Sequence, residues 1–194
     1  MIRAYIFATS NVNKAREIES ALPEGFRIIT MKDAGFDIDI PEPFTTLEEN
    51  SRHKAQTIYK LTGQNCFAED TGLEVESLQG APGVRSARFA GLQRNDERNM
   101  QKLLALMKNT HNRRAHFRTV ITLIEKGKEF QFEGVCYGSI IEEKRGKEGF
   151  GYDPVFRPEG SLRTFAELTL AEKNECSHRK KALSSMIAYL KTNT

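Results

Sequence analysis

The chain has 194 residues, a length that suits one domain with a hydrophobic core and a ligand cleft. Its 29 basic and 26 acidic residues leave a net charge of +3, so it lacks the charge of a dedicated nucleic-acid-binding protein, and a small anionic substrate fits better. Its 3 cysteines are widely spaced, which argues against a disulfide framework or a structural zinc site. No segment has the apolar length of a signal peptide or a membrane span, so we expect a cytoplasmic protein without a membrane partner.

The N-terminal part of the chain is predicted to alternate strands with helices. An apolar run at Ala4–Ala8 predicts a buried strand, and the polar turn 9–13 leads into a helix from about Lys14 to Leu22. A second strand is predicted at Phe26–Thr30. The order of strand, polar turn and helix is common at phosphate-binding sites.

A long helix is predicted next, followed by a central strand. Thr46 and Glu49 have the spacing of a capping box, and apolar residues recur with helical spacing from there until Gly63. The apolar run Cys66–Ala68 predicts a strand that ends at Glu69–Gly72, after which Leu73–Val75 resumes an extended pattern. We therefore expect two acidic side chains at the carboxyl end of a strand, where open α/β sheets bind their ligands.

The second half of the chain changes from helical to strand periodicity and back. Apolar residues at helical spacing predict a helix from about Asn95 to Met107, and period-two patterns at Phe117–Ile124 and Glu129–Tyr137 predict a β-hairpin. Ser177 is a good N-cap for a final helix. The pattern predicts an α/β fold with a mixed β-sheet flanked by helices, in a single domain spanning residues 1–194.

Acidic side chains are the candidate metal ligands. Glu42 follows a proline and Glu69–Asp70 comes at the predicted strand end, so together they could offer hard oxygen ligands to Mg²⁺. Alternatively, Glu42 is a solvated loop residue and Asp70 begins a turn before Gly72. Asp70 is the stronger candidate, because a carboxylate beside a buried strand carries a desolvation cost unless it has a function.

Basic and hydroxyl side chains are the candidate phosphate ligands. Thr9, Asn11 and Lys14 surround a helix N-terminus, where backbone N–H groups and the helix dipole favour an anion. An ordinary helix cap explains the same residues, and the chain has no Walker-type glycine loop. Lys54 lies on the predicted long helix, where a lone lysine is more often part of a solvated face.

A segment of glycines and aromatics near the C-terminus is the candidate base-binding element. Glycines bracket Phe150 and let the backbone approach a flat ligand, while Phe150 and Tyr152 offer ring faces for stacking. Further along, His178 and Arg179 could donate to the keto oxygen of a purine and reject adenine, which presents an amino donor there. The alternative is that Phe150 belongs to the core and Arg179 pairs with a glutamate.

Several motifs occur together in one order, and in combination they are specific. They are the segments 8–14, Glu69–Leu73, Gly80–Arg88, Gly149–Pro154 and Lys173–Arg179. On these segments the chain resembles the inosine triphosphate pyrophosphatase family over essentially its full length. The resemblance implies an elongated mixed sheet in two lobes with a central cleft, a homodimer, and Mg²⁺-dependent hydrolysis of ITP, dITP and XTP to the monophosphate and pyrophosphate, which keeps these nucleotides out of DNA and RNA.

The resemblance also implies a role for each motif residue. Glu42 and Asp70 would hold Mg²⁺, with Asp70 also activating the attacking water, and Thr71 would bind substrate. The residues that would hold the phosphates are Thr9, Ser10, Asn11, Val12, Asn13, Lys14 and Lys54. The residues that would hold the nucleoside are Phe150, Gly151, Tyr152, Asp153, Lys173, His178 and Arg179.

The chain departs from the family pattern at two places. Ser10 replaces a common Gly or Asn in the first motif, which bears on how closely that turn approaches phosphate. Glu175 and Cys176 replace a pair of small and apolar residues, which adds a negative charge near the pocket.

Two other hypotheses stay open from the sequence. The same stacking and phosphate groups would serve a pyrimidine or a modified base, and His178 with Arg179 is what separates that enzyme from a keto-purine pyrophosphatase. A non-catalytic module that binds nucleotides or nucleic acid would use the same basic residues, but it would not need Glu42 and Asp70 together.

Overall fold

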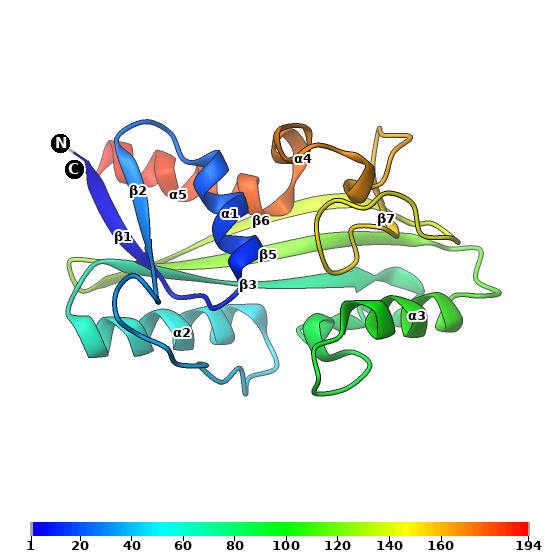
Figure 1. Ribbon diagram of the computed structural model, residues 1–194, viewed down its shortest axis with the longest axis horizontal. Helices are drawn as coiled ribbons and strands as arrows, with labels where there is room; N and C mark the ends of the chain where they lie inside the picture. Colours follow the sequence, from blue (N-terminus) through cyan, green and yellow to red (C-terminus); the bar gives the residue numbers. More distant parts are fainter. Residues whose placement is uncertain (1, 194) are drawn as a thin grey trace. The chain divides into compact units, whose positions relative to one another are not determined.

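The structure is a computed structural model that describes residues 2–193, and these form two compact units (Figure 1). Unit 1 contains the residues up to Asp70, the segment Thr119–Gly134 and the residues from Arg179 on. Unit 2 contains Thr71–Arg118 and Val135–His178. None of the described helices is long and apolar enough to cross a membrane.

The strands belong to a mixed sheet, as the sequence predicts. They are β1 (Arg3–Phe7), β2 (Phe26–Thr30), β3 (Cys66–Val75), β4 (Pro82–Gly83), β5 (Arg114–Glu125), β6 (Lys128–Ile140) and β7 (Phe156–Pro158). They hydrogen-bond in the order β2-β1-β3-β5-β6-β7, with β4 added to β3. β1 pairs in parallel with β2 and β3, whereas β4 is antiparallel to β3 and β7 is antiparallel to β6. The α/β prediction is therefore confirmed.

The helices of unit 1 cover its strands on both faces. They are α1 (Val12–Ala21), α2 (Leu47–Thr62) and α5 (His178–Thr192), the last belonging to unit 1 from Arg179 on. In Figure 1, α1 and α5 lie on one side of the strands and α2 lies on the other. Alternate residues of β1 pack in two cores: Tyr5 and Phe7 lie in the cluster of α1 and α5, whereas Ile6 lies in the cluster of α2, together with Ala8 just after the strand.

Unit 2 has one apolar core of its own. It contains α3 (Asp96–Leu106) and the short helix α4 (Leu170–Cys176). Residues of α3, including Met100 and Leu103, belong to the same buried cluster as Phe117, Phe156 and Phe165. The ring centroids of Phe117 and Phe156 are 4.7 Å apart, an edge-to-face contact that aromatic pairs favour.

The local signals that the sequence carries are largely confirmed. The Thr46 side chain caps α2, and Gly63 ends that helix in the left-handed conformation with φ +64°. The hairpin of β5 and β6 turns at Lys126 and Gly127, whose φ angles of +50° and +79° suit a type I′ turn. α1 begins at Val12, slightly before the predicted start. α4 and β7 were not predicted, because such short elements carry no clear periodicity.

One prediction about β3 is wrong. The strand does not end at Asp70 but continues to Val75, so Glu69–Asp70 lies within a strand and not in a turn. Leu73 and Val75 are fully buried in the core of unit 2, which explains why the extended backbone continues. Gly72 permits this path, because a Cβ there would lie 2.7 Å from the backbone oxygen of Gly83 on β4.

Replacing Gly72 with alanine should therefore lower the free energy of unfolding by about 2–3 kcal/mol, since the added methyl group meets backbone atoms. Gly160→Ala is the control, because no atom lies within 4 Å of its Cβ position and only its φ of +78° opposes the change. We expect a loss of about 1 kcal/mol there. Urea unfolding of both variants measures the difference, and equal losses would contradict the steric explanation.

Candidate active site

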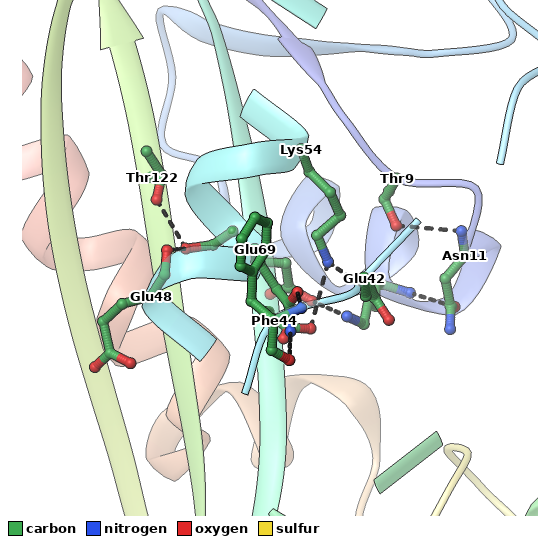
Figure 2. Close-up of polar contacts among 12 residues, drawn as sticks. Thr9, Asn11, Glu42, Phe44, Glu48, Lys54, Glu69 and Thr122 are labelled. Atoms are coloured by element: carbon green, nitrogen blue, oxygen red, sulfur yellow. Dashed lines mark hydrogen bonds and ion pairs between the residues drawn. The ribbon is translucent and has the colours of Figure 1, made fainter. Parts of the chain in front are cut away.

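The turn that precedes α1 is organised by its own side chains. The Asn11 side chain accepts a hydrogen bond from the backbone N–H of Lys14 at 3.1 Å, and the Thr9 hydroxyl accepts one from the N–H of Asn11 at 3.2 Å (Figure 2). Ser10, Val12 and Asn13 are exposed. The residues predicted for phosphate binding thus form a capped and accessible helix N-terminus, a place where backbone donors favour an anion.

Lys54 lies at the centre of a buried group of charges in unit 1. It is 6% exposed, which shows that it is not part of a solvated helix face. Its ammonium donates to Glu42 Oε1 at 2.6 Å and to Asp70 Oδ1 at 3.3 Å (Figure 2). The structure therefore brings together the two carboxylates that the sequence singles out as metal ligands, and it places a lysine on both.

The charges of this group affect one another. Burial alone would lower the pKa of the Lys54 ammonium, but the carboxylates of Asp70 and Glu42 raise it overall. Burial raises the pKa of the Asp70 carboxyl, and this effect outweighs the opposing influence of Lys54 and Lys14. Lys54 therefore stays charged, and its charge only partly offsets the cost of burying the Asp70 carboxylate.

The same residues fit a magnesium ion. Asp70 Oδ2 is buried and has no hydrogen-bond partner in the protein, so a strong acceptor is left for a ligand that the chain does not supply. Among the described residues, no group of three or more His, Cys, Asp or Glu side chains forms a complete metal cage. Two carboxylates suit Mg²⁺, which takes its remaining ligands from water and substrate phosphate.

Glu69, which the sequence grouped with Glu42 and Asp70 as a possible magnesium ligand, is instead a buried partner of basic side chains. Consecutive residues of a strand point to opposite faces, so Glu69 points away from Asp70 and toward α1 and α5. Its carboxylate accepts from Arg179 Nε at 3.0 and 2.8 Å and lies 3.1 Å from Lys14 Nζ. Burial opposes ionisation, but Arg179 and Lys14 lower the pKa of Glu69 to about 2. A double acid within a buried strand was the signal that could have identified this role.

Arg179 is held by carboxylates within unit 1. Besides Glu69, its guanidinium hydrogen-bonds to Glu17 on α1, and Arg179 is only 2% exposed. Burial disfavours its charge, yet the two glutamates raise its pKa above the ordinary value. Of the two alternatives that the sequence allowed, the structure contains the one in which Arg179 pairs with glutamate.

In unit 2, a buried ion pair fixes the candidate base-binding segment. Asp153 Oδ2 accepts the backbone N–H of Phe150 at 2.9 Å and the ammonium of Lys173 at 2.6 Å. The same ammonium lies 5.3 Å from the centroid of the Phe150 ring, within range of a cation–π contact. Gly149 adopts φ +75°, and a Cβ there would collide with the Asp153 carboxylate. Phe150 is half-buried, so part of its ring remains accessible.

The remaining candidate residues of unit 2 are less accessible than the sequence suggested. Tyr152 is 4% exposed and its hydroxyl donates to the backbone oxygen of Ser86, so the prediction that its ring offers a stacking face is wrong. Its ring is needed to fill the core. His178 is also buried, with its ring stacked 4.7 Å from that of Phe117. Thr71 is half-buried on β3.

The comparisons with known proteins agree with this fold and identify the family of the chain. The Ham1 family model matches residues 5–189, and the chain belongs to the Ham1 family. A dITP/XTP pyrophosphatase of Flavobacterium psychrophilum is 49% identical over 186 residues, which cover 96% of this chain and 98% of that protein. A dITP/XTP pyrophosphatase of Porphyromonas gingivalis is 49% identical over 187 residues, covering 95% of this chain and 96% of the relative.

Solved structures show the same fold. The Staphylococcus aureus Ham1 protein matches with a TM-score of 0.88 and 34% identity, covering 99% of this chain and 100% of that one. A structure described as a nucleoside-triphosphatase / dITP/XTP pyrophosphatase from Mycobacterium abscessus matches with a TM-score of 0.76 and 37% identity, covering 95% and 99%. The mixed α/β architecture is thus that of Ham1 proteins.

The pair of Asp153 and Lys173 generates a stability prediction. Asp153→Ala removes an acceptor from a buried ammonium and from the N–H of Phe150, so the free energy of unfolding should fall by about 3 kcal/mol or more. Glu175→Ala, which removes an exposed carboxylate from α4, should change it by less than about 0.5 kcal/mol. Thermal and urea unfolding measure both. A loss at Asp153 no larger than at Glu175 would show that the pair does not hold the segment.

Proposed function

We propose that this chain is a nucleoside-triphosphate pyrophosphatase that hydrolyses ITP, dITP and XTP to the monophosphate and pyrophosphate, and so removes these nucleotides from the cellular pool. The proposal rests on one observation above all. A buried lysine joins two carboxylates, and one carboxylate oxygen of Asp70 is buried without a partner. The relatives named dITP/XTP pyrophosphatase give the class of substrate. The same family resemblance leads us to propose a cytoplasmic homodimer.

The phosphates would be held by unit 1. The turn 9–13 offers the backbone N–H groups of a helix N-terminus, and Asn11 keeps that helix start in place. Lys14, on the first turn of α1, and Lys54, on α2, add two positive charges. These groups require only phosphate oxygens, so they would serve every nucleoside triphosphate alike.

Glu42 and Asp70 would hold Mg²⁺, which when bound would neutralise charge on the phosphates and on the departing pyrophosphate. Asp70 also has the position to accept a hydrogen bond from the attacking water, since its buried Oδ2 has no partner in the protein. The Lys54 ammonium keeps Asp70 and Glu42 from repelling each other. Asp70 then orients the water and receives its proton as the bond to phosphorus forms.

The nucleoside would be held by unit 2. Phe150 would stack on the base, and the N–H of Gly151 belongs to a turn that Asp96 fixes by accepting it at 2.8 Å. Asp153 and Lys173 hold this segment, while Tyr152 anchors it in the core. Thr71 and His178 complete the residues that we assign to substrate binding. Arg179 belongs to the same set, but its guanidinium is engaged by two glutamates.

A panel of nucleoside triphosphates with Mg²⁺, scored separately for pyrophosphate and orthophosphate, tests the proposal. We expect kcat/KM for ITP, dITP and XTP to exceed that for ATP by about 100-fold or more, because a site that donates to a keto group leaves a donor unpaired when adenine binds. It should also exceed that for dUTP and dTTP, whose single-ring bases offer Phe150 less area for stacking. Pyrophosphate should be the only inorganic phosphate compound that is released. Release of orthophosphate would refute the reaction class, and equal rates for dUTP or dTTP would refute the purine preference.

Replacing Asp70 with asparagine should lower kcat by about 100-fold or more, because the amide neither accepts the proton nor binds a cation as strongly. Asp37→Asn, an exposed residue of unit 1, is the control and should leave kcat unchanged. Removing metal with EDTA should abolish turnover of the parent chain, and excess Mg²⁺ should restore it. Unchanged pyrophosphate release by the Asp70 variant would instead support a role for this group outside catalysis.

A further inference from the structure

Four charged side chains of unit 1 form a connected group beside the proposed phosphate turn. The group, which we name the α1 ring, consists of Lys14, Glu17, Glu69 and Arg179. The Lys14 ammonium lies 3.1 Å from Glu69, Glu69 accepts from Arg179 Nε at 2.8 Å, and Arg179 also hydrogen-bonds to Glu17. Lys14 and Glu17 lie one turn apart on α1, so the helix itself closes the ring.

The α1 ring is buried except at one point. The side chains of Glu69, Arg179 and Glu17 are 0%, 3% and 6% exposed, whereas that of Lys14 is 16% exposed. Taking four charges out of water is costly, and apolar side chains of similar volume often stabilise a protein as well or better. The ring therefore needs a reason other than stability. Its accessible member, Lys14, lies where the phosphates would bind.

We propose that Glu69 is a positioning residue, which fixes the Lys14 ammonium at the N-terminus of α1 so that it can contact phosphate, and that Arg179 holds Glu69 in that position. The inference rests on the proposed function, because it assumes that Lys14 binds the triphosphate. A lysine side chain has many rotamers, and fixing its end before the ligand arrives lowers the entropy that binding must overcome. Glu69 also needs Arg179 as a second cation, since otherwise its charge would cancel that of Lys14.

This role differs from recognition of the base. The Arg179 groups that donate to Glu69 and Glu17 are engaged within unit 1, so Arg179 acts through Glu69 on the phosphate turn. Disturbing the ring should consequently weaken the binding of every triphosphate by the same factor. It should not alter the preference for one base over another.

Variants that keep the charge of a ring residue but move it test whether the position of that charge matters, and not only its presence. Glu69→Asp shortens the carboxylate arm, and Arg179→Lys replaces a planar fork with a single ammonium that cannot serve both glutamates. Inorganic triphosphate with Mg²⁺ is the probe, because it has no base, and isothermal titration calorimetry measures its Kd. We expect each variant to raise Kd about tenfold, which corresponds to losing one charge-assisted hydrogen bond. Glu24→Asp, an exposed carboxylate of the same unit, should leave Kd unchanged.

A double-mutant cycle with Lys14→Met gives the decisive measurement. If Glu69 acts by holding Lys14, then Glu69→Asp should change Kd by less than about twofold once the ammonium is gone. Steady-state kinetics should agree, with KM raised equally for ITP and GTP and kcat kept, whereas a merely structural role would lower the active fraction and leave KM alone. Additive effects in the cycle would overturn the inference. A changed ratio of ITP to GTP in Arg179→Lys, without a change in triphosphate affinity, would also overturn it.

Folding of each variant is checked by circular dichroism at the assay temperature. If Glu69→Asp is unfolded there, Glu17→Asp disturbs the ring from its far side and should raise Kd about threefold, and no change in this variant would contradict the inference. A parent chain that neither hydrolyses the panel nor binds inorganic triphosphate would refute the proposed function and the inference with it. A parent chain that hydrolyses ITP but gives an additive cycle would refute the inference alone.

Discussion

Two consecutive carboxylates in a buried strand can be kept only if each has its own cation. In β3, Glu69 and Asp70 point to opposite faces of the sheet, and a separate helix supplies the partner on each face. Lys54 on α2 meets Asp70, while Lys14 on α1 and Arg179 on α5 meet Glu69. Burial disfavours the charged form of both acids, and these cations oppose that effect. The helices on both faces of unit 1 are therefore positioned by charge as well as by apolar packing.

The same arrangement gives the two faces of β3 different roles. The face toward α2 contains the atoms that the proposed chemistry needs, because Asp70 and Glu42 share Lys54 and one oxygen of Asp70 is left for a ligand. The face toward α1 also carries buried charges, but there the carboxylates of Glu69 and Glu17 are neutralised by Lys14 and Arg179. If the proposed function holds, one strand supplies a catalytic acid and a positioning acid from adjacent residues.

Elements with a strong local signal could be predicted from the sequence, whereas contacts between distant residues could not. The N-cap at Thr46 and the turn at Gly127 are local features, and both are present in the structure. Asp70 was expected to end its strand, because a polar residue after an apolar run resembles a boundary until its burial and its partner Lys54 are known. Glu69 and Tyr152 were misjudged for the same reason, since the partners that explain their burial lie far away in the chain.

The hydrogen bond from the N–H of Phe150 to Asp153 has a consequence for recognition. A glycine-rich loop is ordinarily mobile, and ordering it on binding would consume part of the affinity for the ligand. Here the loop is fixed from inside the protein by a carboxylate that is itself held by Lys173. If a base stacks on Phe150, as we propose, it would meet a rigid surface. Discrimination between bases would then depend on shape and hydrogen-bond direction instead of on the ability of the loop to adapt.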